Sequence, residues 1–342
     1  KLLVQGSHIY SIHVEHWKFM LNAMVQRWLV MRLAMMLELA FSGALESRKV
    51  FSIADVHGDF EHFKLILTGL GVATFEEERA QWTGGDAILV STGDSVDRGV
   101  YAKPIYLAFK ELHAQAPEYG GEVINLCGNH ELMNLQGDLR YVVGSEYKLY
   151  GGREERRMAW SAQGMHGEIR ERYLAAAVRG GTLFVHGGLD PKIIGSYGSG
   201  AAAIDALNAE VKKLFEKEVV DFNHRLFGQR GPFWNRNFAE SPDSVACQLV
   251  ESTLDIVGAK RMVIGHTPQD DGITLRCIHP EHGPQIILAD VFISRAYAYP
   301  GITNRPCGIE YDGDTIVSYC FSFSGHVERK VLHSGSQRHP EF

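Results

Sequence analysis

The sequence contains few cysteines, five among 342 residues, and no two of them form a CxxC pair. An odd number without that spacing argues against a disulfide framework and against a zinc ribbon. Cys127 and Cys320 each stand in an apolar run, so we expect both to be small buried hydrophobic side chains. This cysteine usage favours a reducing compartment. For the location as a whole, the cytoplasm or an organelle lumen is favoured.

Long blocks of basic residues are also missing. The chain has 34 Lys and Arg residues against 41 Asp and Glu residues, and its formal net charge is −7. This balance does not suggest a nucleic-acid-binding surface. The run GGREERR, residues 151–157, mixes both signs of charge, which predicts a solvated face.

No apolar run is long enough to predict an integral membrane span. The most apolar stretch, WLVMRLAMMLELAFSGAL, is interrupted by Arg32 and Glu38, whereas a span needs about 20 uninterrupted apolar residues. Its near-helical spacing favours an amphipathic helix over the core of a signal peptide. Residues 1–47 are therefore interpreted as an N-terminal extension, either an amphipathic helix or a signal or targeting segment.

The remaining sequence predicts an α/β fold. Hydrophobic residues make up 45% of the chain, which supports a sizeable core. Short apolar runs alternate with helical stretches, a pattern typical of layered α/β domains. The five runs expected as buried strands are KVFSIA, AILVST, EVINLC, TLFVH and RMVIGH. The helices expected after the first, second and fourth runs cover residues 60–70, 102–116 and 201–227.

Two regions depart from this alternation. Residues 133–180 are rich in Gly, Arg, Glu and Tyr and helical only in patches, so we interpret them as a mostly helical cap inserted into a catalytic domain of residues 48–330. Further strands are expected within residues 284–299, 307–322 and 325–333, where the YDGD turn signals a hairpin. Residues 331–342 are expected to form a disordered tail.

Polar, chemically capable residues follow each of the five predicted strands. They are Asp55 and His57; Asp94, Asp97 and Arg98; Asn129 and His130; His186; and His266. In open α/β sheets, ligands bind outside the carboxyl ends of the strands, so these side chains should converge on one place. The glycines in the same turns would allow close backbone approach to a bound group.

The residue types indicate a metal site. Two Asp, three His and one Asn supply mixed oxygen and nitrogen ligands, which suit Mn, Fe, Zn or Co better than Ca. Six such groups exceed the needs of one open catalytic site, and a bridging carboxylate would let them hold two ions. Each motif alone is weak, since an Asp-His turn is often surface decoration and Asn-His can cap a helix. Five motifs in this order, each after an apolar strand, form a much stronger signal.

The motifs DVHGD, GDSVDRG, GNHE, HGG and GHT together resemble the PPP-type metallophosphatases of the calcineurin-like metallophosphoesterase superfamily. The tracts GNHELMNLQGDLRYV, GPFWNR and ISRAY look more like the Shewanella-like phosphatase subfamily than the animal-type Ser/Thr phosphatases. The resemblance implies a β-sandwich with flanking helices and a helical cap insertion. Two departures stand out: Ala54 replaces the usual Gly of the first motif, and a SAPNYC-type loop is missing, which puts sensitivity to toxin inhibitors in doubt.

The resemblance also implies roles for the motif residues. Two divalent ions, with Mn²⁺ favoured and Fe, Zn or Co as alternatives, would activate a water for attack on phosphorus. The implied metal ligands are Asp55 and His57 for the first ion, Asp94 for both, and Asn129, His186 and His266 for the second. Arg98 and Arg236 would grip the phosphate, assisted by Asn129. His130 would protonate the leaving oxygen, with Asp97 orienting its ring.

The predicted function is hydrolysis of phosphomonoesters on phosphorylated proteins or peptides, at Ser/Thr, at Tyr or at both. One alternative is a small-molecule phosphoesterase, such as a diadenosine-tetraphosphate hydrolase, for which a tight basic and aromatic pocket in the cap would argue. Another is a pseudo-phosphatase that only binds its partner, which would require a missing ligand or acid. No such residue is missing from the motifs.

Overall fold

The computed structural model describes residues 27–28, 31–32, 48–217, 220, 223–297, 301 and 303–335. The chain divides into two units, Lys1–Ser47 and Arg48–Phe342. The predictions for residues 1–47 and for most of the 331–342 tail concern residues outside this description. None of the helices in the described part of the chain combines the length and apolar character needed to cross a membrane.

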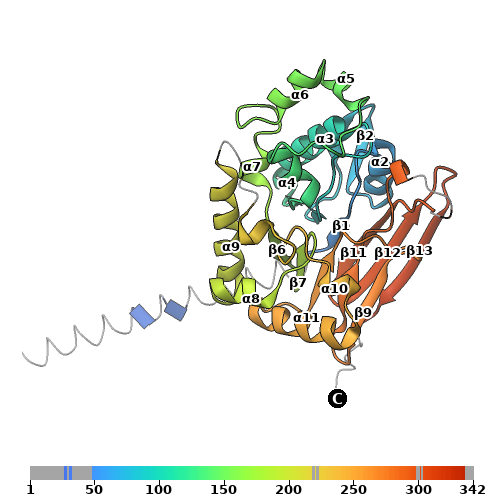
Figure 1. Cartoon of the computed structure of the whole chain (residues 1–342). Coiled ribbons are helices and arrows are strands. Elements are labelled where there is room, and N and C mark those ends of the chain that lie inside the picture. Colours follow the sequence, from blue (N-terminus) through green and yellow to red (C-terminus); the bar gives the residue numbers. More distant parts are fainter. Residues whose placement is uncertain are drawn as a thin grey trace, which may run out of the picture. The chain divides into compact units, whose positions relative to one another are not determined.

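The second unit is built on two mixed sheets with flanking helices, which confirms the predicted α/β sandwich (Figure 1). The six-stranded sheet has the order β13 (Val327–His333), β12 (Thr315–Phe321), β11 (Cys307–Asp312), β1 (Val50–Ile53), β4 (Ile88–Ser91) and β5 (Glu122–Asn125). The five-stranded sheet has the order β6 (Ala176–Arg179), β7 (Thr182–Val185), β8 (Arg261–Ile264), β10 (Gly283–Leu288) and β9 (Thr274–His279). Each of the five strands predicted from apolar runs is present.

The alternation of side chains along the central strands explains the layers. In a strand, successive side chains point to opposite faces. Phe51 and Leu89 therefore join a core that includes residues of α2 (Phe60–Gly69) and α3 (Ala102–Gln115). Val50 and Val90 join a second core that also holds Phe184 of the other sheet. The two sheets are thus packed face to face, with helices on the outside.

The strand directions place the motif residues at one end of the sandwich. Strands β1, β4 and β5 are parallel, with Val50 paired to Ile88 and Ile88 to Glu122. In the other sheet, β7, β8 and β10 are parallel as well. The carboxyl ends of parallel strands lie at the same edge of a sheet. Six strand ends, three from each sheet, therefore carry the loops of the candidate site.

Some elements differ from the sequence prediction. Helix α9 covers Gly200–Phe215, so it is shorter than the expected stretch 201–227. A hairpin of β2 (Ala73–Glu76) and β3 (Arg79–Trp82) and a helix α11 (Asp243–Val257) occur where the sequence analysis predicts no element. The β11–β12 hairpin at the YDGD turn is confirmed, with Asp312 paired to Thr315.

The prediction about the cysteines is partly wrong. Cys127 is buried and free, as expected. Cys320, however, forms a disulfide with Cys307, and Cys247 forms one with Cys277. Cys307 and Cys320 face each other across β11 and β12, so strand register brings them together. Cysteine count and local spacing carry no information about such a cross-strand pair.

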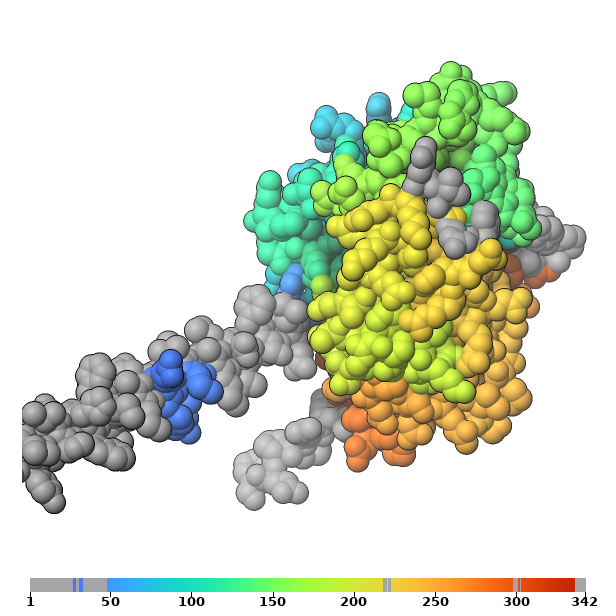
Figure 2. Space-filling view, turned by 60° about the vertical axis from the view of Figure 1, so that its left-hand side comes forward, coloured from blue at the N-terminus to red at the C-terminus, as the bar shows by residue number. Residues whose placement is uncertain are grey.

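The cap consists of short helices: α4 (Asn129–Leu135) leads into it, followed by α5 (Glu146–Tyr150), α6 (Arg153–Ala159) and α7 (Ile169–Arg172). Figure 2 shows the face of the molecule where this green region adjoins the yellow helix α9. Arg170 of α7 donates to the carbonyl of Phe215 at 2.6 Å, which ties the cap to the end of α9. The predicted solvated face of residues 151–157 is wrong for Arg156, whose exposed fraction is 1%.

Candidate active site

Three histidine side chains surround one carboxylate oxygen of Asp94, in the loop after β4. The Nε2 atoms of His186, His57 and His130 lie 3.4, 3.6 and 3.9 Å from Oδ2 of Asp94. These separations are longer than hydrogen bonds, but they suit pairs of ligands on a shared cation. Asp94 is therefore the centre of the site.

Two groups of potential ligands share Asp94. One comprises His57, Asp94 and His130, and the other comprises Asp94, His186 and His266, with the ligand atoms of each group within 4.8 Å of one another. Two overlapping groups joined by one carboxylate are consistent with a dinuclear metal site. The first group contains His130 where the sequence-based assignment has Asp55, so these distances do not reproduce that assignment in full.

The orientation of the rings supports metal binding. Nδ1 of His57 donates to the Val96 carbonyl at 3.0 Å, and Nδ1 of His186 donates to the Thr92 carbonyl at 2.9 Å. With the proton on Nδ1, the neutral form of each ring directs the Nε2 lone pair toward Oδ2 of Asp94, and Nε2 of His186 also lies 2.9 Å from Oδ1 of Asn129, another acceptor. Two acceptors facing each other call for a cation between them, and backbone bonds of this kind orient metal-binding histidines.

Asp55 and His266 each supply a buried polar atom that tests whether the residues present fit a metal ion. Oδ1 of Asp55 accepts the backbone N–H of His266 at 3.0 Å, whereas Oδ2 of Asp55 and Nε2 of His266 are buried without a hydrogen-bond partner among the described residues. Burial, together with Asp290 and Asp94, raises the pKa of Asp55 well above its ordinary value. Burial lowers the pKa of His266 to about 2, which keeps the ring neutral. Both groups are suited to a bound cation.

The backbone of the site is unusual. Among the described residues, nine other than glycine have positive φ, and six of them are motif residues with φ from 37° to 65°: Asp55, His57, Asp94, Asp97, Arg98 and His266. Such conformations cost roughly 1–3 kcal/mol each and concentrate at functional sites. A Cβ at Gly128 would collide with Oδ1 of Asp94, and a Cβ at Gly265 would collide with Oδ2 of Asp55. The motif glycines thus leave room for the carboxylates.

Glu131 is a site residue that the sequence analysis misses. It is fully buried, and its carboxylate accepts the backbone N–H groups of Asp94, Ser95 and Gly128 at 2.7–2.8 Å. Burial and the charge of Asp94 raise its pKa to about 7. Glu131 therefore fastens the loop after β4 to the loop after β5. Its place inside the GNHE motif is the signal that could have identified it.

Asp290 is a second residue that the sequence analysis misses. It stands just after β10, in the same position relative to its strand as the motif residues, and its side chain is buried. Burial raises its pKa to about 7. The tract IILAD, an apolar run that ends in Asp, carries the same signal as the five recognised motifs.

A small cavity of about 130 Å³ opens at this centre. Its lining includes seven of the predicted site residues: His57, Asp94, Arg98, Asn129, His130, Arg236 and His266. Asp290, Tyr141 and Tyr297 also contribute. Asp55, Asp97 and His186 are not part of the lining, and each of them contacts a residue that is.

Two guanidinium groups face this cavity. Arg98 is positioned between the rings of Tyr141 and Tyr297, with its guanidinium carbon 4.6 and 5.0 Å from their centroids. Arg236 donates from Nη1 to the His266 carbonyl at 2.7 Å and to Thr267 Oγ1 at 3.1 Å. Both are therefore held in place by the protein, and forked donors of this kind suit a phosphate group.

His130 and Asp97 form a buried pair beside the cavity. Nδ1 of His130 donates to Oδ2 of Asp97 at 2.8 Å, and Nδ2 of Asn134 donates to Oδ1 of Asp97 at 2.9 Å. Burial lowers the pKa of His130, but the charges of Asp94 and Asp97 outweigh it, so the pKa is raised. With Nδ1 directed to Asp97, Nε2 is the atom that can exchange a proton in the cavity.

The sequence also matches known proteins. A family model described as Calcineurin-like phosphoesterase matches residues 48–270. An uncharacterized protein of Schizosaccharomyces pombe is 32% identical over 272 residues, covering 75% of this chain and 78% of the relative. Shewanella-like protein phosphatase 2 of Arabidopsis thaliana is 29% identical over 301 residues, which cover 73% of this chain and 72% of that relative.

Solved structures agree on the fold. The cold-active protein-tyrosine phosphatase of a psychrophilic Shewanella species aligns with a TM-score of 0.63 and 23% identity, covering 84% of this chain and 80% of that one. The resemblance read from the motifs is confirmed, and the family model covers more than half of the sequence. The chain belongs to the calcineurin-like phosphoesterase family.

Proposed function

We propose that the protein is a phosphoprotein phosphatase that works with two divalent cations, Mn²⁺ being the favoured ion. The observation that carries this proposal is the convergence of three imidazole Nε2 atoms on Oδ2 of Asp94, beside a cavity lined by two guanidinium groups. The name of the Arabidopsis relative, a protein phosphatase, supports a protein substrate.

The residues that would hold the cations are those assigned from the motifs. Asp55 and His57 would bind the first ion, Asp94 would bind both, and Asn129, His186 and His266 would bind the second. The unpartnered Oδ2 of Asp55 and Nε2 of His266 support these assignments. When bound, the cations lower the pKa of a water and neutralise charge on phosphoryl oxygens.

Arg98 and Arg236, which both line the cavity, would bind the phosphate there. The two tyrosine rings hold the guanidinium of Arg98, and the backbone after β8 holds that of Arg236. Since both groups are preorganised, little side-chain entropy is lost when the substrate binds. Asn129 lines the same cavity and would add an amide contact.

His130 would act as the general acid. As the oxygen of a water forms a new bond to phosphorus, the bond from phosphorus to the leaving oxygen breaks. The leaving oxygen takes the electron pair of that bond and the proton of His130 Nε2. Asp97 would hold the ring through Nδ1, which fixes both its direction and the position of the proton.

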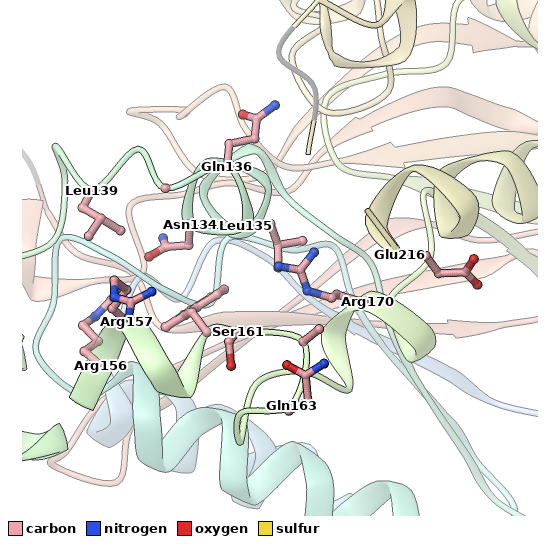
Figure 3. Close-up of a pocket in the computed structure, with 13 residues that line it drawn as sticks. Asn134, Leu135, Gln136, Leu139, Arg156, Arg157, Ser161, Gln163, Arg170 and Glu216 are labelled. Atoms are coloured by element: carbon pink, nitrogen blue, oxygen red, sulfur yellow. The ribbon is translucent and has the colours of Figure 1, made fainter. Parts of the chain in front are cut away.

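A second candidate is the small-molecule phosphoesterase, favoured by a cavity of about 640 Å³ in the cap (Figure 3). Its lining contains Arg157, Arg170 and Trp160, a basic and aromatic combination that suits a nucleotide. Among the described residues, this cavity and the catalytic cavity have no lining residue in common. A phosphorylated protein therefore remains the proposed substrate. Hydrolysis of a dinucleotide instead of a phosphopeptide would replace this proposal.

The test is hydrolysis by metal-stripped protein re-supplied with Mn²⁺. The substrates are matched phosphotyrosine and phosphoserine/threonine peptides and diadenosine tetraphosphate, and His130→Asn serves as the inactive control. We expect metal-dependent hydrolysis of a peptide that the variant loses by a factor of about 10² or more. The ratio of the two peptide rates measures residue preference, because a phenyl ring carries the phosphate farther from the backbone.

Cleavage of the dinucleotide alone would move the function to small-molecule phosphoesters. If no substrate were turned over, the binding-module alternative would replace the proposal. Full activity of the His130→Asn variant on the peptides would remove His130 from its proposed role.

A further inference from the structure

The cap contains one arginine that the charge pattern places at the surface and the fold places in the interior. Arg156 belongs to the run GGREERR, and its side chain is 1% exposed. The side chain of the next residue, Arg157, is 68% exposed and pairs with Glu154. Helix α6 thus buries the guanidinium of Arg156 and leaves those of Arg153 and Arg157 exposed to water.

Arg156 reaches from the cap to the catalytic pair. Its Nε donates to Oε1 of Glu146 at 3.1 Å, and its Nη2 lies 3.8 Å from Oδ1 of Asp97. The rings of Trp160, Tyr150 and Tyr147 lie 5.4, 5.6 and 5.9 Å from its guanidinium carbon. Two carboxylates and three aromatic rings therefore fix the position of this charge.

Burial of an arginine is costly unless other charges compensate it. Asp97 is itself fully buried, and its two oxygens already accept from His130 and Asn134. Arg156 is a second cation beside this carboxylate, in addition to the protonated form of His130, and its 3.8 Å separation is about 1 Å longer than a hydrogen bond. Its effect on Asp97 is therefore mainly electrostatic.

The cap cavity does not account for the buried guanidinium. Figure 3 shows Asn134 and Arg156 on one side of that cavity, opposite Arg170 and Glu216. Nη1 and Nη2 of Arg156 are nevertheless closed off from solvent and have no hydrogen-bond partner among the described residues. A ligand in the cavity could not contact these two nitrogens, whereas Oδ1 of Asp97 lies 3.8 Å from Nη2.

We propose that Arg156 is a positioning residue for the general acid, an inference that rests on the proposed function. The chain Glu146–Arg156–Asp97–His130 connects the cap to the ring that protonates the leaving oxygen. Arg156 holds the Asp97 carboxylate in place, and Asp97 in turn directs Nε2 of His130 toward the substrate. The cap thus contributes to the chemical step.

The test compares two esters that differ in how much they need an acid. The leaving group of 4-nitrophenyl phosphate departs readily without a proton, whereas that of phenyl phosphate needs one. With Mn²⁺ present, Arg156→Met should lower kcat about 10- to 100-fold for phenyl phosphate and less than about 3-fold for 4-nitrophenyl phosphate, with KM unchanged. Equal losses on both esters, or no loss on phenyl phosphate, would overturn the inference.

A double-mutant cycle supplies the second readout. If Arg156 acts through His130, adding Arg156→Met to His130→Asn should cause no further loss on phenyl phosphate. Losses that multiply would show an independent structural role. Arg153→Met removes the same charge from an exposed position of the same helix, outside the lining of both cavities, and should keep wild-type rates, so it is the matched control.

Folding of each variant is checked by circular dichroism and thermal unfolding. Should Arg156→Met fail to fold, Arg156→Lys keeps the charge but loses the fork that reaches Glu146 and Asp97. It should show a smaller loss, again confined to phenyl phosphate. A wild-type protein that hydrolyses neither ester would overturn the proposed function itself, whereas an active wild type with uniform losses in the variants would overturn only this inference.

Discussion

At the strand ends, Asp55, Asp94 and Asp290 stand in loops directly after buried strands, whereas the buried Glu146 and Arg156 of the cap stand on short helices whose other residues are exposed or half-buried (Figure 1). Asp94 follows β4, and glycines flank its motif. Arg156 follows two acidic residues on α6 and precedes another arginine. The comparison teaches that a charge beside an apolar strand indicates a site, whereas a charge within a charged run reveals nothing of its burial.

The largest expected effect is on the strand-end side. Asp94→Asn removes the carboxylate that both groups of potential ligands share. We expect kcat to fall by about 10³-fold or more, because metal-assisted activation of water would be lost. Turnover of a phosphopeptide and metal content after dialysis measure the two consequences. Retained activity with a full complement of metal would contradict the central place of Asp94.

Asp290→Asn tests the strand end that the sequence analysis misses. The variant keeps the shape of the side chain but removes a buried carboxylate next to the cavity. We expect metal affinity to fall about 10- to 100-fold, as for other residues that support metal ligands. Titration of the metal-free protein with Mn²⁺ measures this change, and an unaltered affinity would place Asp290 outside the metal centre.

Tyr141 belongs to the cap and lines the catalytic cavity, so a substitution there tests the contact between the cap and the strand-end loops. Its ring lies against the guanidinium of Arg98, with 4.6 Å between that carbon and the ring centroid. Tyr141→Ala should raise KM about 3- to 10-fold, since it removes one cation–π contact that holds Arg98. Tyr141→Phe keeps the ring and should retain the wild-type KM. A rise of equal size in both variants would assign the effect to the hydroxyl group instead.

A further expected effect concerns stability in the cap rather than catalysis. Burial raises the pKa of Glu146 to about 7 from an ordinary value of 4.5, although Arg156 opposes the shift. Between these pH values the folded protein keeps a proton that the unfolded chain releases, so the free energy of unfolding falls as pH rises. Between these two pH values, the free energy of unfolding of the wild type should fall by up to about 3 kcal/mol more than that of the Glu146→Gln variant.

Denaturant unfolding at pH 5 and pH 8 measures this difference. Identical pH dependence in the wild type and the Glu146→Gln variant would show that Glu146 ionises normally in the folded protein.

The sequence was sufficient to predict the five parallel strands β1, β4, β5, β7 and β8 and the site residues that follow them. Both are local features: an apolar run determines a buried strand, and the polar residue after it stands at the strand's carboxyl end. Asp290 carries the same local signal after β10 and could have been predicted in the same way.

The tertiary structure alone decided the rest. The Cys307–Cys320 pair depends on the register of β11 and β12, and the burial of Arg156 depends on Glu146, Asp97 and three aromatic rings meeting from separate segments. Positions adjacent in a strand share a local pattern that can be read along the chain. Contacts between distant segments depend on how the whole chain packs, and no short stretch of sequence encodes them.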